Sequence, residues 1–390
     1  MKIPDVIVCG AGVIGCAIAR ELAAEGVAVT VLDRGRAGGE ASGAAAGLLT
    51  GQADFDEDSA FARLCRESAL GFAAFAEAVA LESGIPVHHR TCGSLRFASG
   101  APDAARMARI EKWQKSAAWP VERVSGRRLE EIAGRDFPSG ARDALYFAEE
   151  AIVDNVALVA ALRLSAERRG ARFRTETAAL GVRIGDGACR GVSTTGGDLA
   201  AGAVIDAAGS WAGFDPALPF SVPVRPIRGQ IVELAASGGP PARIVHGGGF
   251  YVAPRERGRI LVGATVEEAG YDKTVTAEAV KGLIERGGAL VPRLAEASVV
   301  AAWAGLRPMA PDGLPILGTT PLRGFLLATG HFRNGILLSP VTARLLSDVV
   351  LGRPTALDLA PYAVGRFSDE RAGRPAQARR LYTKKRVLVR

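Results

Sequence analysis

Near the N-terminus, the stretch Val6-Ile7-Val8-Cys9-Gly10-Ala11-Gly12-Val13-Ile14-Gly15 combines a short apolar run with three spaced glycines. The apolar residues Val6 to Val8 are typical of a buried parallel strand. A helical pattern over Ala17 to Glu25 follows, and then a second apolar run, Val27 to Leu32, which ends at Asp33. The order of strand, glycine turn, helix, strand and acid predicts a Rossmann-type unit that binds a dinucleotide.

Each glycine has a physical task in such a unit. Gly10 allows the tight turn, Gly12 lets the backbone approach a pyrophosphate, and Gly15 lets helix and strand pack closely. The N-terminus of the helix then presents N–H groups and the positive end of its dipole to the phosphates. Asp33 is placed to accept hydrogen bonds from the adenosine ribose, and its charge disfavours a 2′-phosphate.

Three further segments favour FAD over NAD. Residues 40–49 are mostly small and can lie against a flat ring or a ribityl chain. Residues 203–211 form an apolar strand that runs into a small-residue turn and Trp211, and ligands bind at such strand ends. Residues 324–338 form a strand, a glycine loop and a helix that extends to about Val350. The N-terminus of this second helix suits the N1–C2=O edge of a reduced, anionic flavin.

The later motifs resemble the D-amino-acid-oxidase superfamily, and most of all its glycine oxidase branch. They are Trp303-Ala304-Gly305-Leu306-Arg307-Pro308, Asp312-Gly313-Leu314-Pro315-Ile316-Leu317-Gly318 and Gly330-His331-Phe332-Arg333-Asn334-Gly335-Ile336-Leu337-Leu338. Two further segments also fit, namely Pro226 to Gln230 and Tyr251 to Arg255 with Val262 to Thr265. The resemblance covers about residues 4 to 367 and is loose between about 90 and 145.

The resemblance implies an α/β fold in which a Rossmann-type FAD-binding domain is assembled from residues 1–87, 145–217 and 300–366. A discontinuous α+β substrate domain with an antiparallel sheet would comprise residues 88–144 and 218–299. Strand patterns at 230–234, 249–253 and 259–262 suit such a sheet. Residues 367–390 would form a basic tail.

The resemblance also implies oxidation of a small amine. The amine would arrive neutral, transfer hydride to flavin N5, and leave as an imine that water hydrolyses, while O2 reoxidises the flavin. Arg307 is expected to grip the substrate carboxylate with two parallel hydrogen bonds. Tyr251 is expected to complete that clamp, and Arg333 to lie beside the substrate amine. His331 is a candidate catalytic base, but the mechanism needs no acid or base. We therefore interpret His331 as a residue of the loop that contacts the cofactor.

The same resemblance assigns the remaining cofactor contacts to three groups of residues. They are Gly10, Gly12, Val13, Ile14, Gly15, Asp33 and Arg34; Ser42, Ala45, Ala46, Gly47 and Leu48; and Gly209, Trp211, Gly330, His331, Arg333, Asn334, Gly335 and Ile336. Some relatives attach the flavin to a cysteine in the stretch that matches residues 303–318. Because this stretch contains no cysteine, we expect non-covalent FAD.

Composition limits the other classes of function. The five cysteines form no CxxC pair, which disfavours a disulfide framework or a metal site. No apolar run is long enough to span a membrane, and no signal peptide is recognised, so we expect a cytoplasmic enzyme. From Arg366 onward nine basic residues accompany two acidic ones, which accounts for the whole net charge of +7. The body is thus formally neutral, which argues against a nucleic-acid partner.

Three functions stay open at this point. The first is a glycine oxidase that makes glyoxylate, ammonia and hydrogen peroxide and feeds thiamine thiazole synthesis. The second is a D-amino-acid or sarcosine dehydrogenase that passes electrons to a quinone or another carrier. The third, and weakest, is a tRNA-modifying flavin oxidase whose basic tail gathers RNA, although this tail has only Tyr382 for base stacking. The sequence does not decide the preferred amine or whether the protein is a homo-oligomer.

Overall fold

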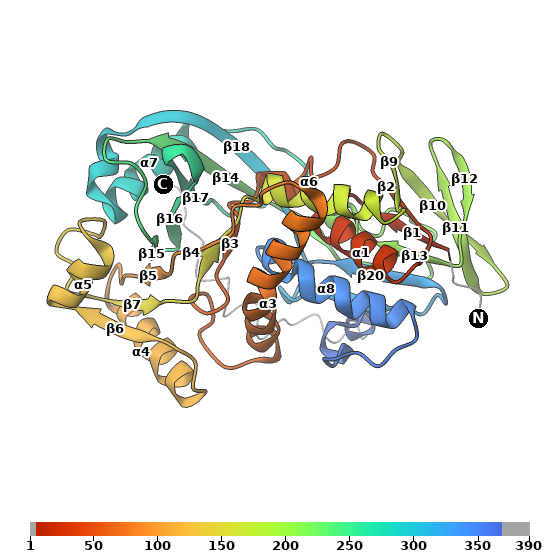
Figure 1. Ribbon diagram of the computed structural model, residues 1–390, viewed down its shortest axis with the longest axis horizontal. Coiled ribbons are helices and arrows are strands. Elements are labelled where there is room, and N and C mark those ends of the chain that lie inside the picture. Colours follow the sequence, from red (N-terminus) through yellow and green to blue (C-terminus); the bar gives the residue numbers. More distant parts are fainter. Residues whose placement is uncertain (1–4, 369–390) are drawn as a thin grey trace.

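The computed structural model describes residues 5–368. The molecule is elongated, with a parallel sheet and its helices in one half and a larger, mostly antiparallel sheet in the other (Figure 1). The strands β14 (Arg225–Ala235) and β18 (Ser298–Met309) belong to the larger sheet. The predicted combination of a Rossmann-type α/β domain and a sheet-based second domain is confirmed.

The parallel sheet contains six strands in the order β19-β20-β13-β1-β2-β9. All neighbouring strands are parallel except β19 and β20, which are antiparallel. The strands are β1 (Val6–Cys9), β2 (Val29–Leu32), β9 (Arg172–Arg174), β13 (Ala203–Asp206), β19 (Ile316–Thr319) and β20 (Phe325–Thr329). The strands β1, β13 and β20 lie next to one another although they are far apart in sequence, so their carboxyl ends meet at one edge.

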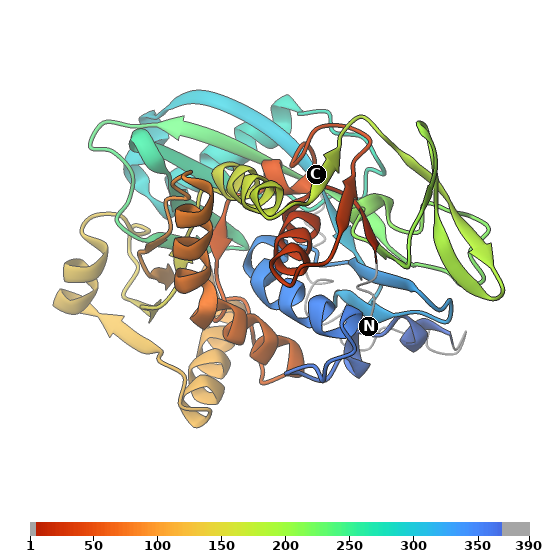
Figure 2. The same cartoon turned by 45° about the vertical axis from the view of Figure 1, so that its right-hand side comes forward.

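Alternation along the strands explains the layers on the two faces of this sheet. Val6, Val8 and Ile205 pack against helices, whereas Ile7 and Val204 pack on a small three-stranded sheet. The helices are α1 (Val13–Ala24), α3 (Ala60–Ser83), α6 (Asn155–Arg168) and α8 (Gly335–Val350). The small sheet consists of β10 (Ala179–Gly185), β11 (Ala188–Thr194) and β12 (Gly197–Ala200). Figures 1 and 2 show α1 and α8 side by side, and the first residues of both helices, Val13 and Gly335, line one cavity.

The larger sheet contains eight strands in the order β18-β14-β17-β16-β15-β5-β7-β6. Besides β14 and β18, these are β5 (Ser94–Arg96), β6 (Glu122–Ser125), β7 (Asp143–Phe147), β15 (Ile244–Gly247), β16 (Phe250–Pro254) and β17 (Arg259–Gly263). Every neighbouring pair is antiparallel except β5 and β15, which are parallel. The expected antiparallel sheet is therefore interrupted once, where β5 pairs in parallel with β15.

The two faces of the larger sheet have different partners. Val232, Val252 and Val262 on one face pack against α7 (Ala277–Leu290) in a common core. The other face carries Ile231 and Tyr251, which pack with Ala46 from the opposite half of the molecule. Short elements complete this half: α4 (Ala101–Ser116), α5 (Gly126–Ala133), and a small sheet of β3 (Leu48–Leu49), β8 (Ala151–Ile152) and β4 (Arg90–Thr91); α2 (Ala41–Ala44) lies in the small-residue segment.

The strands cross two of the domain limits expected from sequence. The strand β7 spans the expected limit at 145, and β18 spans the one at 300, yet both strands belong wholly to the larger sheet. We therefore propose that the FAD-binding segments start after each of these strands. The predicted tail, residues 367–390, lies almost entirely outside the described residues.

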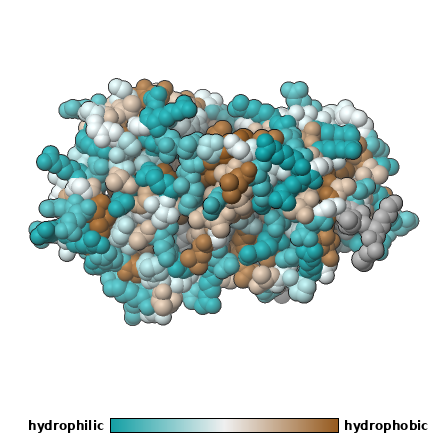
Figure 3. Space-filling model, in the orientation of Figure 1, coloured by the Kyte–Doolittle hydropathy of each residue, from teal (hydrophilic) through white to brown (hydrophobic). Residues whose placement is uncertain are grey.

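The structure also describes the cysteines, the helices that were considered for membrane spanning, and the hydropathy of the surface. All five cysteines are buried, and none forms a disulfide within residues 5–368. No helix in the described part of the chain is long and apolar enough to cross a membrane. The face in Figure 3 is largely hydrophilic, with apolar side chains in small separate groups.

Candidate active site

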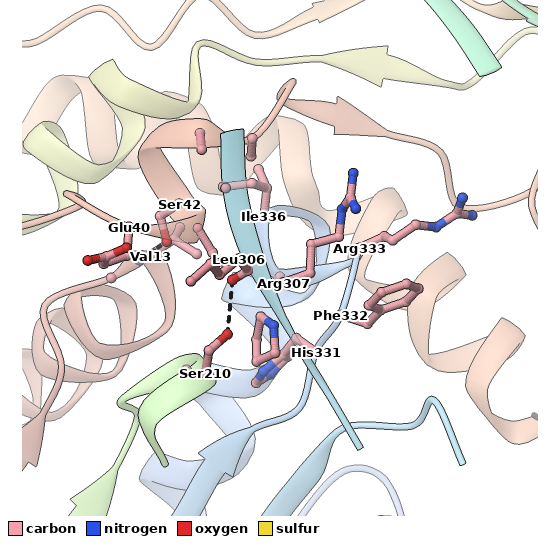
Figure 4. A pocket seen from close by; sticks show the side chains of 18 of the residues that line it. Val13, Glu40, Ser42, Ser210, Leu306, Arg307, His331, Phe332, Arg333 and Ile336 are labelled. Atoms are coloured by element: carbon pink, nitrogen blue, oxygen red, sulfur yellow. Dashed lines mark hydrogen bonds between the residues drawn. The ribbon is translucent and has the colours of Figure 1, made fainter. Parts of the chain in front are cut away.

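A cavity of about 440 Å³ lies between the two halves of the molecule. Its walls come from the carboxyl end of the parallel sheet, from the small-residue segment around α2, and from one face of the larger sheet. In Figure 4, Val13, Ser42 and Glu40 lie at one end, and the Arg307 and Arg333 side chains extend toward the other. The cavity therefore has a glycine-turn end and an arginine end.

The glycine turn leaves no room for side chains. Gly10 has a φ of +111°, and a Cβ there would lie 2.4 Å from the Ala207 carbonyl oxygen. A Cβ on Gly15 would lie 1.9 Å from the Gly10 carbonyl oxygen, because α1 packs directly on β1. At the N-terminus of α1, the Ser42 hydroxyl accepts a hydrogen bond of 2.9 Å from the Val13 N–H. The N-cap residue, Gly12, has no side chain to cover this terminus, which suits a pyrophosphate.

Asp33 and Arg34 form the next part of this end. The two Asp33 carboxylate oxygens accept hydrogen bonds from the Ala11 and Gly35 N–H groups, each 2.8 Å long. These bonds fix the carboxylate beside the glycine turn and leave lone pairs for ribose hydroxyls. The Arg34 guanidinium lies 3.6 Å from the centre of the Trp211 ring, a cation–π contact.

The second helix terminus closes the middle of the cavity. Helix α8 begins at Gly335, after the loop that contains His331, and no described side chain caps its N-terminus by a hydrogen bond. The Phe332 N–H donates to the Pro308 carbonyl oxygen at 2.7 Å, so the loop is fixed to β18. Helices α1 and α8 therefore both direct N-termini at the cavity, as the sequence predicts.

Two glycines in the larger sheet make space for the anchor side chains. The Arg307 guanidinium lies flat on Gly229, where an added Cβ would be 2.1 Å from Nη2. The Tyr251 ring lies in the same way on Gly263, where an added Cβ would be 2.2 Å from the phenol oxygen. Arg307 also donates to the Thr265 carbonyl oxygen at 3.0 Å. Both side chains are held by the sheet and still line the cavity.

Electrostatics support a carboxylate-binding role for this pair. Burial lowers the pKa of Arg307 to about 10, while the neighbouring Tyr251 acts in the opposite direction. Burial also raises the pKa of Tyr251 to about 12, so the phenol is neutral and able to donate a hydrogen bond. A buried guanidinium and a phenol on one wall form a favourable site for a carboxylate.

Comparison with known proteins agrees with this geometry. Residues 5–349 match the family model described as FAD dependent oxidoreductase. The chain belongs to this family. It is 35% identical over 369 residues to the glycine oxidase of Geobacillus kaustophilus, covering 93% of this chain and 97% of that protein.

Solved structures give the same result. The crystal structure of glycine oxidase from Geobacillus kaustophilus superposes with a TM-score of 0.89 at 34% identity and covers 94% of this chain and 99% of that one. Iminodiacetate oxidase from Chelativorans sp. has a TM-score of 0.83 at 27% identity, over 92% of this chain and 98% of that one. The predicted resemblance to the glycine oxidase branch, and the prediction of an FAD-dependent enzyme of the amino-acid oxidase type, are confirmed.

The residues present fit the FAD that this family uses. The turn at Gly10 excludes any Cβ, α1 and α8 direct two N-termini at one cavity, and small residues form its wall between them. Within residues 5–368, no group of three or more His, Cys, Asp or Glu side chains could hold a metal ion. We expect the pyrophosphate at the α1 N-terminus and the flavin ring near the α8 N-terminus.

Most cofactor contacts expected from sequence line this cavity. They are Gly10, Gly12, Val13, Ile14, Asp33, Arg34, Ser42, Ala45, Ala46, Gly47, Leu48, Gly209, Trp211, His331, Arg333, Asn334, Gly335 and Ile336. Gly15 and Gly330 do not line it. Gly15 serves helix–strand packing, and Gly330, with a φ of +73°, forms the turn after β20.

His331 is buried and lines the cavity. Its Nε2 lies 3.1 Å from the Thr342 hydroxyl oxygen, and burial lowers the pKa of His331 to about 3. The imidazole is therefore neutral at physiological pH, and its protonated form is disfavoured. This environment suits a loop residue better than a proton acceptor.

The structure adds residues at the arginine end that sequence reasoning missed. Asp54, Arg96, Arg106 and His246 line the cavity beside Arg333. The Arg333 guanidinium pairs with Asp54 at 2.9 Å. Burial opposes ionisation of Asp54, but Arg333 and the nearby cations hold its pKa well below the usual range. The sequence contains one feature that could have indicated Arg96 as a buried site residue. Arg96 lies between apolar Leu95 and Phe97, much as Arg307 lies between Leu306 and Pro308.

Proposed function

We propose that the protein oxidatively deaminates glycine or another small amino acid. Glycine, O2 and water would give glyoxylate, ammonia and hydrogen peroxide. The amine carbon loses a hydride, the amine nitrogen loses a proton, and water then replaces the imine nitrogen. The glycine oxidase name of the relatives above supports the proposal.

One observation carries the proposal, namely the Arg307–Tyr251 pair on the wall of the cavity that also contains the glycine turn. A guanidinium binds a carboxylate through two parallel hydrogen bonds, and a neutral phenol can add a third. Gly229 and Gly263 let both side chains lie flat on the sheet, and the hydrogen bond from Arg307 to the Thr265 carbonyl oxygen helps to fix the guanidinium. An anchor held in this way places the α-carbon of the bound substrate at a defined position in the cavity, and this is the positioning that the reaction needs.

Other residues that line the cavity exclude water and determine the electrostatic environment of the substrate. Phe332 and Ile336 supply buried apolar surface around the reacting carbon. His331 is neutral, so it adds no charge near the amine. When bound, FAD supplies the two-electron acceptor for the oxidation. The protein's part is to bind the carboxylate, orient the α-carbon and keep the site dry.

A substrate panel with an oxygen electrode and a peroxide assay tests this function. The panel contains glycine, sarcosine and D-alanine, and it is repeated on Arg307→Ala. Loss of two charged hydrogen bonds, at roughly 1.5–3 kcal/mol each, should lower kcat/KM by about a hundredfold to ten-thousandfold. The matched control is Arg225→Ala, because Arg225 is an exposed arginine on the neighbouring strand that pairs with Glu268.

The outcomes separate the proposed functions. Retained yellow colour with lost activity in Arg307→Ala, and normal activity in Arg225→Ala, support the anchor. Activity of Arg307→Ala with unchanged apparent affinity overturns it. Reduction by amines without peroxide release points to the dehydrogenase that uses a quinone or another carrier. RNA binding lost on deletion of residues 368–390 would favour the tRNA-modifying alternative.

A further inference from the structure

A row of residues crosses the cavity face of the larger sheet. Ile231, Gly263, Tyr251, His246 and Arg96 are direct cross-strand partners on β14, β17, β16, β15 and β5. Partners in a row point to the same face of a sheet. Arg96 therefore faces the same side as Tyr251, two strands further along, or about 10 Å away at the usual strand spacing.

The arginine end carries more positive charge than the anchor requires. The guanidinium groups that line it belong to Arg96, Arg106, Arg307 and Arg333, and Asp54 is the carboxylate among them. Asp54 lies 2.9 Å from Arg333 and 3.5 Å from Arg96. Arg106 is held by Asp56 at 2.6 Å. Arg96, Arg106 and Arg333 are thus cations in addition to the Arg307 anchor.

Among these four cations, Arg96 has a buried side-chain nitrogen that lacks a hydrogen-bond partner within the described residues. It is only 7% exposed, and its Nε has no hydrogen-bond partner among the described residues. Buried donors are rarely left without an acceptor. Glu150 is nearby, but its oxygens already accept from the Gln52 and Ala53 N–H groups and from the Ser94 hydroxyl. Asp103, another neighbouring acid, accepts from Ser99.

We propose that Arg96 binds a second carboxylate, so that the preferred substrate is a small amine with two carboxylates. Arg307 and Tyr251 hold the carboxylate next to the carbon that is oxidised, and Arg96 holds the other. This rests on the proposed function and names its substrate class. The second carboxylate is carried either by the amine nitrogen, as in iminodiacetate, or by the side chain, as in D-aspartate.

The reaction balances for both arrangements. Iminodiacetate, O2 and water give glycine, glyoxylate and hydrogen peroxide, because one C–N bond is oxidised to an imine and hydrolysed. D-Aspartate, O2 and water give oxaloacetate, ammonia and hydrogen peroxide. In each case the C–N unit loses two electrons and O2 accepts them.

The test compares kcat/KM for iminodiacetate and D-aspartate with that for glycine on the holoenzyme. At least one dicarboxylic amine should exceed glycine by roughly tenfold or more, the effect of one charged hydrogen bond. In Arg96→Gln the ratio of kcat/KM for the dicarboxylic amine to kcat/KM for glycine should fall roughly ten- to hundredfold. The matched control is Arg123→Gln, since Arg123 lies on β6 of the same sheet, pairs with Glu111 and Asp143, and should leave the ratio unchanged.

A binding measurement keeps the proposal testable even if Arg96→Gln folds poorly. Succinate or malonate, titrated into the wild-type holoenzyme, should perturb the flavin absorption spectrum at concentrations at least tenfold lower than acetate or propionate. Arg96→Lys keeps the charge but loses the planar guanidinium group that can donate two parallel hydrogen bonds. The difference in binding between dicarboxylates and monocarboxylates should therefore become smaller in this variant.

Three results overturn the proposal: neither dicarboxylic amine exceeds glycine, Arg96→Gln lowers all substrates equally, or dicarboxylates bind no better than monocarboxylates. Any of these, together with good activity on glycine, leaves the proposed function standing. If no amine reduces the flavin at all, the proposed function itself fails.

Discussion

Replacement of Gly229 by alanine tests the anchor without touching its charge. The new Cβ would lie 2.1–2.2 Å from the Arg307 guanidinium atoms, whereas ordinary contacts are 3.4–4 Å. The guanidinium must therefore withdraw by at least about 1.2 Å. A misplacement of about 1 Å costs roughly a hundredfold in rate, which is about 2.7 kcal/mol of transition-state stabilisation.

The fold should tolerate this change, because the clash is with the end of a side chain and not with the backbone. We expect a thermal midpoint near that of the wild type, retained FAD, and a kcat/KM for glycine lowered about a hundredfold. The assay is peroxide release under air, with thermal unfolding measured in parallel.

The matched control is Gly282→Ala. Gly282 lies in α7 on the opposite face of the same sheet, and a Cβ added there would have nothing within 4 Å. It should leave kcat/KM unchanged and stabilise the helix by up to about 1 kcal/mol. If folded Gly229→Ala keeps kcat/KM within threefold of the wild type, Arg307 does not bind the substrate carboxylate from its position on Gly229.

Three other predictions concern the tyrosine, the cofactor and the buried histidine. Gly263→Ala should displace the Tyr251 phenol, which lies 2.2 Å from the added Cβ, and raise KM more than it lowers kcat; an unchanged KM would remove Tyr251 from the clamp. Acid precipitation should release all yellow colour into the supernatant, since residues 303–318 contain no cysteine; colour on the pellet would show a covalent link. Burial lowers the pKa of His331 to about 3, so below the usual pKa of about 6.5 the unfolded chain takes up a proton that the folded chain does not. As the pH falls from 6.5 to 4.5, His331 should lower the free energy of unfolding by up to about 1.4 kcal/mol per pH unit. His331→Asn should lack this contribution to the pH dependence. An equal slope of unfolding free energy against pH in both proteins would contradict the prediction.

Much of the cofactor end could be predicted from sequence, because its features are local. The glycines, the strand before them and Asp33 lie within thirty residues, and their spacing alone determines which atoms meet. The loop from Gly330 to Ile336 also carries its own strand and helix.

The arginine end could not be predicted in the same way. Arg96, His246 and Tyr251 meet because β5 pairs in parallel with β15, and that pairing joins segments about 150 residues apart. No local pattern encodes such a register. The expected domain limits at 145 and 300 fall inside β7 and β18. These strands join the larger sheet through long-range pairing, which no local pattern indicates.

Anaerobic mixing of the purified holoenzyme with a small amine tests the central claim most directly. The claim is that an FAD site anchored by Arg307 oxidises a small amine. Loss of the yellow flavin absorption on addition of glycine or a dicarboxylic amine, much slower in Arg307→Ala than in Arg225→Ala, is the predicted result. A flavin that dithionite bleaches but that stays oxidised with every amine would contradict it.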